Sequence, residues 1–131
     1  ADASYDIVLI QSDIVLDELF LAQLGRVLSK KGMVALVSKN WWIEPECLKE
    51  TLGLLSEKFS VVMPYRYESY SHAGFGGMMI IASRTYHPTA DIILQKSDLL
   101  DDLKYYSCDV HMAAFALSAA MRKDLYPAMK I

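Results

Sequence analysis

Short apolar runs alternate with helix-like segments along the first two-thirds of this 131-residue chain. Two of the runs, YDIVLI and MVALV, are continuous and rich in β-branched residues, as buried parallel strands are. The segments after them carry apolar residues three and four positions apart, which is typical of amphipathic helices. Two more apolar runs then follow in direct succession. The sequence therefore predicts strands at Tyr5–Ile10, Met33–Val37, Val61–Tyr67 and Met78–Ser83, in the order β-α-β-α-β-β.

Start and stop signals predict where the helices lie. The first helix is expected over Asp17–Lys30, with Gly32 as its C-terminal stop. Pro45 is suited to the first turn of the second helix, whose buried face ends at Phe59. A further short helix is expected near the C-terminus, with Asp109 as its N-cap.

The order of the elements also predicts how the strands pair. Strands that alternate with helices run parallel through right-handed crossovers, whereas the last two are joined by a short Gly-rich turn at His72–Gly77 and must pair antiparallel. No glycine-rich cofactor motif follows a strand, so these glycines are interpreted as turn residues. The expected fold class is α/β and resembles the C-terminal half of a Rossmann-like class I methyltransferase fold: a mostly parallel sheet that ends in an antiparallel hairpin.

Composition narrows the class of protein. A hydrophobic content of 53% and a mean hydropathy of +0.20 allow a sizeable core in one domain. No apolar run is long enough to span a bilayer and no signal peptide is visible, so a cytoplasmic protein without membrane contact is expected. The net charge of −3, with scattered Lys and Arg, argues against a nucleic-acid partner.

Two cysteines and one histidine are the residues to consider for a disulfide or a metal site. Cys47 and Cys108 lack the spacing of a disulfide framework, so free thiols are expected. Cys108 and His111 stand three positions apart, but no second pair of ligands completes a zinc site, and no metal is expected.

The stretch Leu103–Leu117, LKYYSCDVHMAAFAL, carries a resemblance to a known family. It resembles the C-terminal signature of the spermidine synthases (polyamine aminopropyltransferases), L-K-Y-Y-N-x-D/E-x-H-x-A-A/S-F-x-L-P. Ser107 replaces the usual Asn of the signature and Ser118 its Pro. Taken without the family, the same letters describe a buried tyrosine pair that leads into a short helix, with His111 packed or capping rather than catalytic.

The resemblance covers the whole chain but only the second half of the family's catalytic domain. It implies that residues 1–131 are the C-terminal part of one Rossmann-like aminopropyltransferase domain, without the N-terminal cofactor-binding half and the β-hairpin domain. The implied reaction transfers an aminopropyl group from decarboxylated S-adenosylmethionine, a co-substrate, to putrescine, giving spermidine. No prosthetic group is implied. Family members are usually dimers or tetramers, so a homo-oligomer is expected.

The chemistry of this reaction calls for carboxylates. A neutral amine attacks a carbon attached to sulfonium, so the site must hold a diammonium substrate and accept a proton. In the family these carboxylates come mainly from a loop D-S/T-S/T-D-P. The matching segment here is Gln11-Ser12-Asp13, where Gln11 takes the first Asp position and a one-residue slip puts Asp13 on the second. Asp13 is therefore expected to be catalytic, with Gln11 and Ser12 binding substrate.

Further site residues follow from the resemblance. Lys39 and Trp41 fall where the family often has Glu and Gln facing the polyamine, and a lysine there repels a diammonium. Trp41 is expected to line the substrate slot, with core packing of the Trp pair as an equal alternative. Tyr70 resembles the substrate-contacting Tyr of the family's T-Y-P-S-G. His72 matches the same position by gapless counting and, with a pKa near working pH, is expected to be a catalytic base.

Two classes of function stay open on these grounds. The signature stretch favours an aminopropyltransferase with a divergent active-site loop. Gln11, Lys39 and the shortened loop instead favour a non-catalytic or re-purposed member of the same fold that acts as a scaffold or dimerisation protein.

Overall fold

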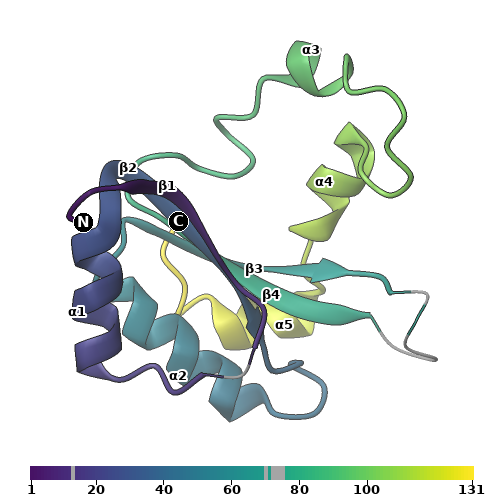
Figure 1. Cartoon of the computed structure of the whole chain (residues 1–131). Helices are drawn as coiled ribbons and strands as arrows, with labels where there is room; N and C mark the ends of the chain where they lie inside the picture. The colour runs from purple at the N-terminus through teal and green to yellow at the C-terminus, as the bar shows by residue number, and fades with distance from the viewer. Residues whose placement is uncertain (13, 70, 72–75) are drawn as a thin grey trace.

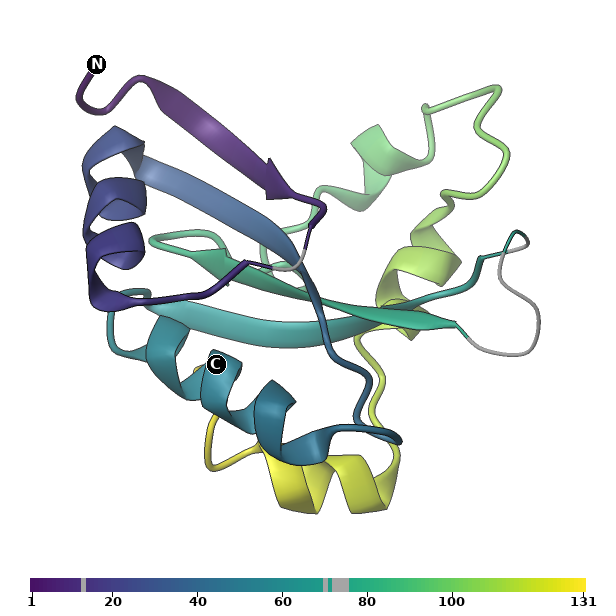
Figure 2. The same cartoon turned by 60° about the horizontal axis from the view of Figure 1, so that its bottom comes forward.

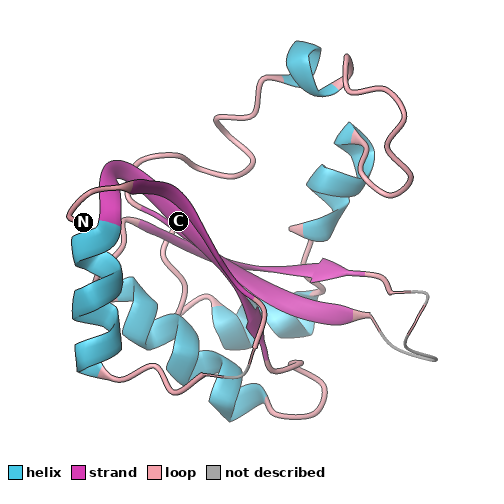
Figure 3. Cartoon of the chain, in the orientation of Figure 1, coloured by secondary structure: helices cyan, strands magenta, loops and turns pink. Residues whose placement is uncertain are grey.

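The computed structural model of the chain describes residues 1–12, 14–69, 71 and 76–131. The elements along these residues, coloured by type in Figure 3, are β1 (Tyr5–Ile10), α1 (Glu18–Val27), β2 (Leu28–Ser38), α2 (Pro45–Ser56), β3 (Val61–Tyr67), β4 (Gly77–Ser83), α3 (Leu94–Ser97), α4 (Cys108–Ala114) and α5 (Ala119–Leu125).

The strands form one mixed sheet in the order β1-β2-β4-β3. β1 pairs in parallel with β2, while β4 lies between β2 and β3 and is antiparallel to both. Three strands therefore run in one direction and β4 in the other. This confirms the four predicted strands and their directions, and it confirms the α/β class of fold.

Helices α1, α2 and α5 cover one face of the sheet, whereas α3, α4 and the chain that connects them lie beyond the other face (Figures 1 and 2). The core lies between the sheet and the first group of helices, because the apolar stripe of each helix faces the sheet. Its most buried members are Leu28, Val34, Leu48, Leu52, Leu55, Val62, Ile80, Met121 and Leu125.

The first helix is shorter than predicted. It ends at Val27 rather than Lys30, and Gly32 is not its stop but a buried residue inside β2. The guanidinium of Arg84 explains the early end, because it donates to the carbonyls of Leu28 (3.0 Å) and Ser29 (2.9 Å) as well as to that of Gly25. Arg84, which directly follows β4, thus satisfies carbonyls that a continued helix would use.

The N-cap of the helix in the signature stretch lies two residues earlier than the predicted Asp109. This N-cap is Ser107, whose hydroxyl accepts from the Val110 backbone N–H at 3.1 Å, and Asp109 lies in the first turn instead. Ser118 caps α5 in the same way and accepts from Met121 N–H at 3.3 Å. Both serines that depart from the family signature are therefore helix caps, a role in which serine is favoured.

The two edges of the sheet differ. At the β3 edge, Val62 and Lys130 exchange backbone hydrogen bonds of 2.6 and 3.0 Å, so the C-terminal residues cover part of that strand. The outer edge of β1 pairs with no strand among the described residues.

Helix α2 begins at Pro45, as predicted, and ends at Ser56.

Candidate functional site

The carboxyl ends of β1, β2 and β3 meet at one edge of the sheet, which is where open α/β sheets bind ligands. Gln11 and Ser12 follow β1 directly and are exposed. The loop 39–44 follows β2, and Glu68 follows β3. The topology thus brings Gln11, Ser12 and the Trp41 loop to the same edge.

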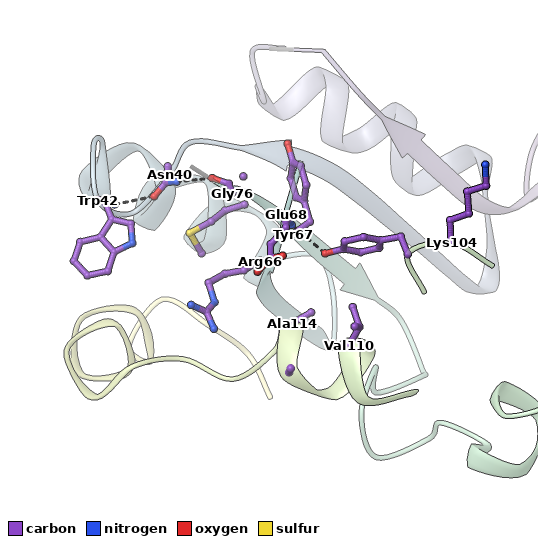
Figure 4. Close-up of a pocket in the computed structure, with 13 residues that line it drawn as sticks. Asn40, Trp42, Arg66, Tyr67, Glu68, Gly76, Lys104, Val110 and Ala114 are labelled. Carbon is purple, nitrogen blue, oxygen red and sulfur yellow. Dashed lines mark hydrogen bonds between the residues drawn. The ribbon is translucent and has the colours of Figure 1, made fainter. Parts of the chain in front are cut away.

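A cleft of about 410 Å³ opens at this edge, and we refer to it as the edge cleft (Figure 4). Four segments form its walls: the loop after β2, the end of β3, the start of β4 and the signature stretch with α4. The lining residues are Asn40, Trp42, Arg66, Tyr67, Glu68, Gly76, Gly77, Met78, Lys104, Tyr105, Val110, Ala113 and Ala114.

The side chain of Asn40 joins two walls of the edge cleft. Its amide nitrogen donates to the carbonyl of Gly76 at 3.2 Å, and its amide oxygen accepts from the backbone N–H of Trp42 at 3.0 Å, as Figure 4 shows. The Asn40 carbonyl also accepts from two backbone N–H groups further along the loop. One side chain therefore fixes both the shape of the loop after β2 and its contact with the start of β4.

Tyr105 of the signature stretch joins the other two walls. Its hydroxyl accepts from the backbone N–H of Glu68 at 3.0 Å (Figure 4). This bond ties the signature to the residue at which β3 ends. The two tyrosines of the signature stretch are thus divided, with Tyr105 in the edge cleft and Tyr106 turned toward His111.

The charged residues of the edge cleft are Arg66, Glu68 and Lys104. None of them has an ion-pair partner in the part of the chain that the structure describes. Glu68 offers a carboxylate to an ammonium group, whereas Arg66 and Lys104 repel one. Aromatic rings of Trp42, Tyr67 and Tyr105 supply apolar surface between these charges.

Two of the glycines near the edge cleft are required by a close approach. A Cβ at Gly76 would collide with the backbone carbonyl of Tyr67, and one at Gly77 would collide with the Tyr67 ring. The structure therefore explains these glycines by the packing of Tyr67 against the start of β4.

Trp41 is directed away from the edge cleft. Its indole N–H donates to the Oδ2 atom of Asp124 on α5 at 2.8 Å, and its ring packs against the core. Trp42 lines the cleft in its place, and the two rings meet edge to face with centroids 4.7 Å apart. The indole of Trp41 therefore has the packed position, and a direct contact with substrate stays a prediction.

The remaining predicted site residues are only partly placed. Asp13, Tyr70 and His72 lie outside the described residues, so their roles also stay predictions. The ammonium of Lys39 lies 3.7 Å from a carboxylate oxygen of Glu44, which offsets part of its charge at this edge.

His111 is a structural residue in this arrangement. Its Nε2 atom lies 2.7 Å from the carbonyl oxygen of Pro88, and its Nδ1 atom lies 3.2 Å from the hydroxyl of Tyr106. A carbonyl can only accept, so Nε2 donates to Pro88, and Nδ1 shares the second hydrogen bond with the Tyr106 hydroxyl. The imidazole thus links α4 to the segment after β4.

A second cavity, of about 440 Å³, lies beneath His111, between the sheet and the segment that carries α3 and α4. Its walls are largely apolar and include Met33, Ile81 and Phe115. Burial raises the pKa of the Tyr65 hydroxyl on this wall above its ordinary value of 10.0, so the ring stays neutral.

Sequence reasoning missed Asn40, Trp42, Glu68 and Tyr105 as cleft residues. Asn40 and Glu68 each follow a predicted strand, and that position was the available signal.

Among the described residues no cluster of three or more His, Cys, Asp or Glu could hold a metal ion, and Cys47 and Cys108 are free. No helix in the described ranges has the length and apolar character to cross a bilayer.

Known proteins resemble this chain in sequence, although no family model matches it. Over 104 residues the chain is 35% identical to the polyamine aminopropyltransferase of Helicobacter acinonychis (strain Sheeba), covering 78% of this chain and 38% of that protein. Identity to the polyamine aminopropyltransferase of Helicobacter pylori (strain G27) is 33% over 96 residues, or 72% of this chain and 35% of the other. The chain thus spans less than two-fifths of the length of these relatives.

Solved structures share the fold. A spermidine synthase in complex with the transition-state analogue AdoDATO superposes with a TM-score of 0.86 at 21% identity, over 96% of this chain and 46% of that one. The spermidine synthase of Thermotoga maritima gives a TM-score of 0.80 at 20% identity, over 96% and 44%. Sequence similarity and shared fold together identify the chain as a member of the spermidine synthase (polyamine aminopropyltransferase) family over the part of those proteins that it spans.

Proposed function

We propose that the intact protein transfers an aminopropyl group from decarboxylated S-adenosylmethionine to putrescine, giving spermidine. The observation that carries this proposal is the 35% identity to a polyamine aminopropyltransferase over 78% of the chain. A second support is the fold, which a spermidine synthase crystallised with a transition-state analogue shares. We further propose that the protein works in the cytoplasm as a homodimer or tetramer, on the family resemblance.

The proposed step is a displacement at carbon. The attacking nitrogen of the diammonium first loses a proton, for which Asp13 is the acceptor, with His72 as the second candidate. Its freed lone pair then forms a bond to the aminopropyl carbon, the carbon–sulfur bond breaks, and the electron pair of that bond neutralises the sulfonium to a thioether. Gln11 and Ser12 orient the amine by hydrogen bonds, and Tyr70 and the Trp41 loop flank the slot.

The edge cleft supports this assignment through its position and its lining. It lies at the carboxyl ends of the parallel strands, where the predicted site residues Gln11 and Ser12 also follow β1. Its aromatic rings suit a methylene chain, and the Glu68 carboxylate suits an ammonium. Arg66 and Lys104 leave little room for a second ammonium, so we place only one end of the diamine in the edge cleft.

The test is Asp13→Asn in the intact protein. Gln11 cannot take a proton away, so loss of the remaining carboxylate of the loop should lower turnover of putrescine by about 10²–10⁴-fold. The melting temperature should hardly change, because a loop tip is seldom buried. Asp6→Asn, an exposed position at the start of β1, is the matched control and should keep activity. Full activity in Asp13→Asn would move the assignment to His72.

The second candidate function is a scaffold or dimerisation protein of the same fold. Gln11 and Lys39 favour it, because one is neutral and the other cationic where a diammonium would bind. Absence of turnover by the intact wild-type protein with every diamine tested, while it still assembles, would establish this reading instead.

A further inference from the structure

One carboxylate outside the edge cleft holds the loop that forms its wall. Asp124 stands on α5, 83 positions along the chain from Trp41, and accepts the indole N–H of Trp41 on Oδ2 at 2.8 Å. The length is that of a strong charge-assisted hydrogen bond. The exposed fraction of the Asp124 side chain is 35%, so the bond is partly shielded from water.

The other oxygen of the same carboxylate is also engaged. Oδ1 of Asp124 accepts from the Lys49 ammonium on α2 at 3.2 Å, and Lys49 also lies 2.7 Å from Glu46. Figures 1 and 2 show α5 beside α2, on the face of the sheet that the core occupies. The carboxylate is thus fixed from two sides and cannot turn without breaking one of its bonds.

Trp41 connects this carboxylate to the edge cleft. Its ring packs against the core on one side and meets the Trp42 ring edge to face on the other, with centroids 4.7 Å apart and planes at 74°. Its backbone N–H donates to the sulfur of Met78, another cleft residue, at 3.5 Å. A rotation of the Trp41 indole would therefore alter its contact with Trp42, which lines the edge cleft.

We propose that Asp124 is a positioning residue for substrate binding, which acts by orienting Trp41 and, through it, the Trp42 wall of the edge cleft. The kinetic part of this inference rests on the proposed aminopropyl transfer. The competing role is a plain ion pair with Lys49 that stabilises α5 against α2 without any effect on the cleft.

Kinetics of the intact protein separate the two roles. Asp124→Leu removes the acceptor of the indole N–H and should raise the KM for putrescine about 5- to 10-fold with kcat within about twofold of wild type. Asp124→Asn keeps an acceptor oxygen and should restore KM. Lys49→Met breaks the ion pair but leaves the Trp41 bond, so KM should stay at the wild-type value. A KM in Lys49→Met that rises as far as in Asp124→Leu would overturn the proposal.

Indole N–H signals in a ¹H–¹⁵N spectrum test the same inference without turnover. Trp41→Phe and Trp42→Phe assign the two signals of this segment. In Asp124→Leu both signals should move, that of Trp41 by loss of its acceptor and that of Trp42 by the shift of its neighbour, whereas Lys49→Met should leave Trp42 in place. A stationary Trp42 signal in Asp124→Leu overturns the positioning role. If the wild type turns over no diamine, the proposed function fails and this measurement still decides the inference.

Should Asp124→Leu not fold, Trp41→Phe removes the same bond from the donor side. It should raise KM to a similar degree. Asp124→Ala, which also lacks an acceptor oxygen, should raise KM on its own but add no further increase to Trp41→Phe, because both changes act on one interaction. Additive increases in KM would overturn the coupling.

Discussion

His111, the histidine of the signature stretch, is occupied on both ring nitrogens by groups of the protein itself. The carbonyl of Pro88 accepts a hydrogen bond from Nε2, and the hydroxyl of Tyr106 is hydrogen-bonded to Nδ1. A ring held in this way has no free nitrogen with which to accept a proton from a substrate. The packed reading of His111 is therefore the one that the structure supports.

Replacing this ring should cost stability. His111→Leu leaves the Pro88 carbonyl and the Tyr106 hydroxyl without partners, and we expect a loss of about 1–3 kcal/mol in the free energy of unfolding. Tyr106→Phe removes one bond alone and should cost about 0.5–1.5 kcal/mol. Urea denaturation of both variants measures the difference. A His111→Leu protein of wild-type stability but without turnover would instead make the ring catalytic.

The Asp124 carboxylate should make stability depend on acid pH. The Trp41 hydrogen bond, followed by the Lys49 bond, lowers its pKa below the ordinary value of 3.8. The folded state therefore binds the proton less readily than the unfolded state, so this contribution is complete above that ordinary value and is lost as pH falls through the folded-state pKa. Wild type should exceed Asp124→Asn in urea midpoint at neutral pH, and the gap should close in acid. A gap that is constant with pH would contradict the assignment.

At the scale of elements, the continuous apolar runs predicted the strands because each run falls within a single strand. The helix boundaries were harder to predict from the sequence. α1 ends before its predicted limit at Lys30, because the guanidinium of Arg84, which stands 56 positions from Leu28, satisfies the carbonyls of Gly25 and Leu28. The residues around Lys30 give no indication of a partner so far along the chain. The tertiary contact with Arg84 therefore overrode the local pattern that predicted a helix up to Lys30.

In the candidate site, too, some positions could be predicted from the sequence and others could not. The family resemblance assigned Gln11 and Ser12 to the loop after the first strand, and in the structure they follow β1 directly, while their contact with substrate stays a prediction. The direction of the Trp41 indole was not predictable, because its partner Asp124 lies on α5. Tyr105 could be expected near the site from the signature, but its bond to Glu68 depends on how the signature folds back over β3.

Arg84 offers a test of the turn between α1 and β2. Arg84→Met removes the donors to the carbonyls of Gly25, Leu28 and Ser29, and should lower the free energy of unfolding by about 2–3 kcal/mol. Arg84→Lys should recover only part of this, because an ammonium cannot reproduce the planar fork. Arg26→Met is the control: its exposed ion pair with Asp2 should contribute at most about 1 kcal/mol. Equal losses in the two methionine variants would refute the special role of Arg84.

At the scale of the whole molecule, the helices of the core cover one face of the sheet while the β1 end of the other face stays open. Ile7 and Leu9 on β1 are 60% and 64% exposed, whereas Val8 and Ile10, which alternate with them along the strand, pack toward the core. The outer side of this strand has no pairing partner within the described ranges. An exposed apolar strand with free backbone donors and acceptors is a template for pairing with another strand.

The chain of residues 1–131 on its own should therefore self-associate, and charge on β1 should reduce this. Lysine at Ile7 or Leu9 places an ammonium on the exposed side of the strand, where it opposes strand pairing without entering the core. Val15→Lys, at a position 83% exposed in the loop before α1, adds the same charge away from the edge and should leave association unchanged. Light scattering over a concentration series measures the mass. A clean monomer of the unmodified chain would show that the β1 edge is not an association surface, and equal effects of Val15→Lys and Ile7→Lys would assign the change to net charge rather than to strand pairing.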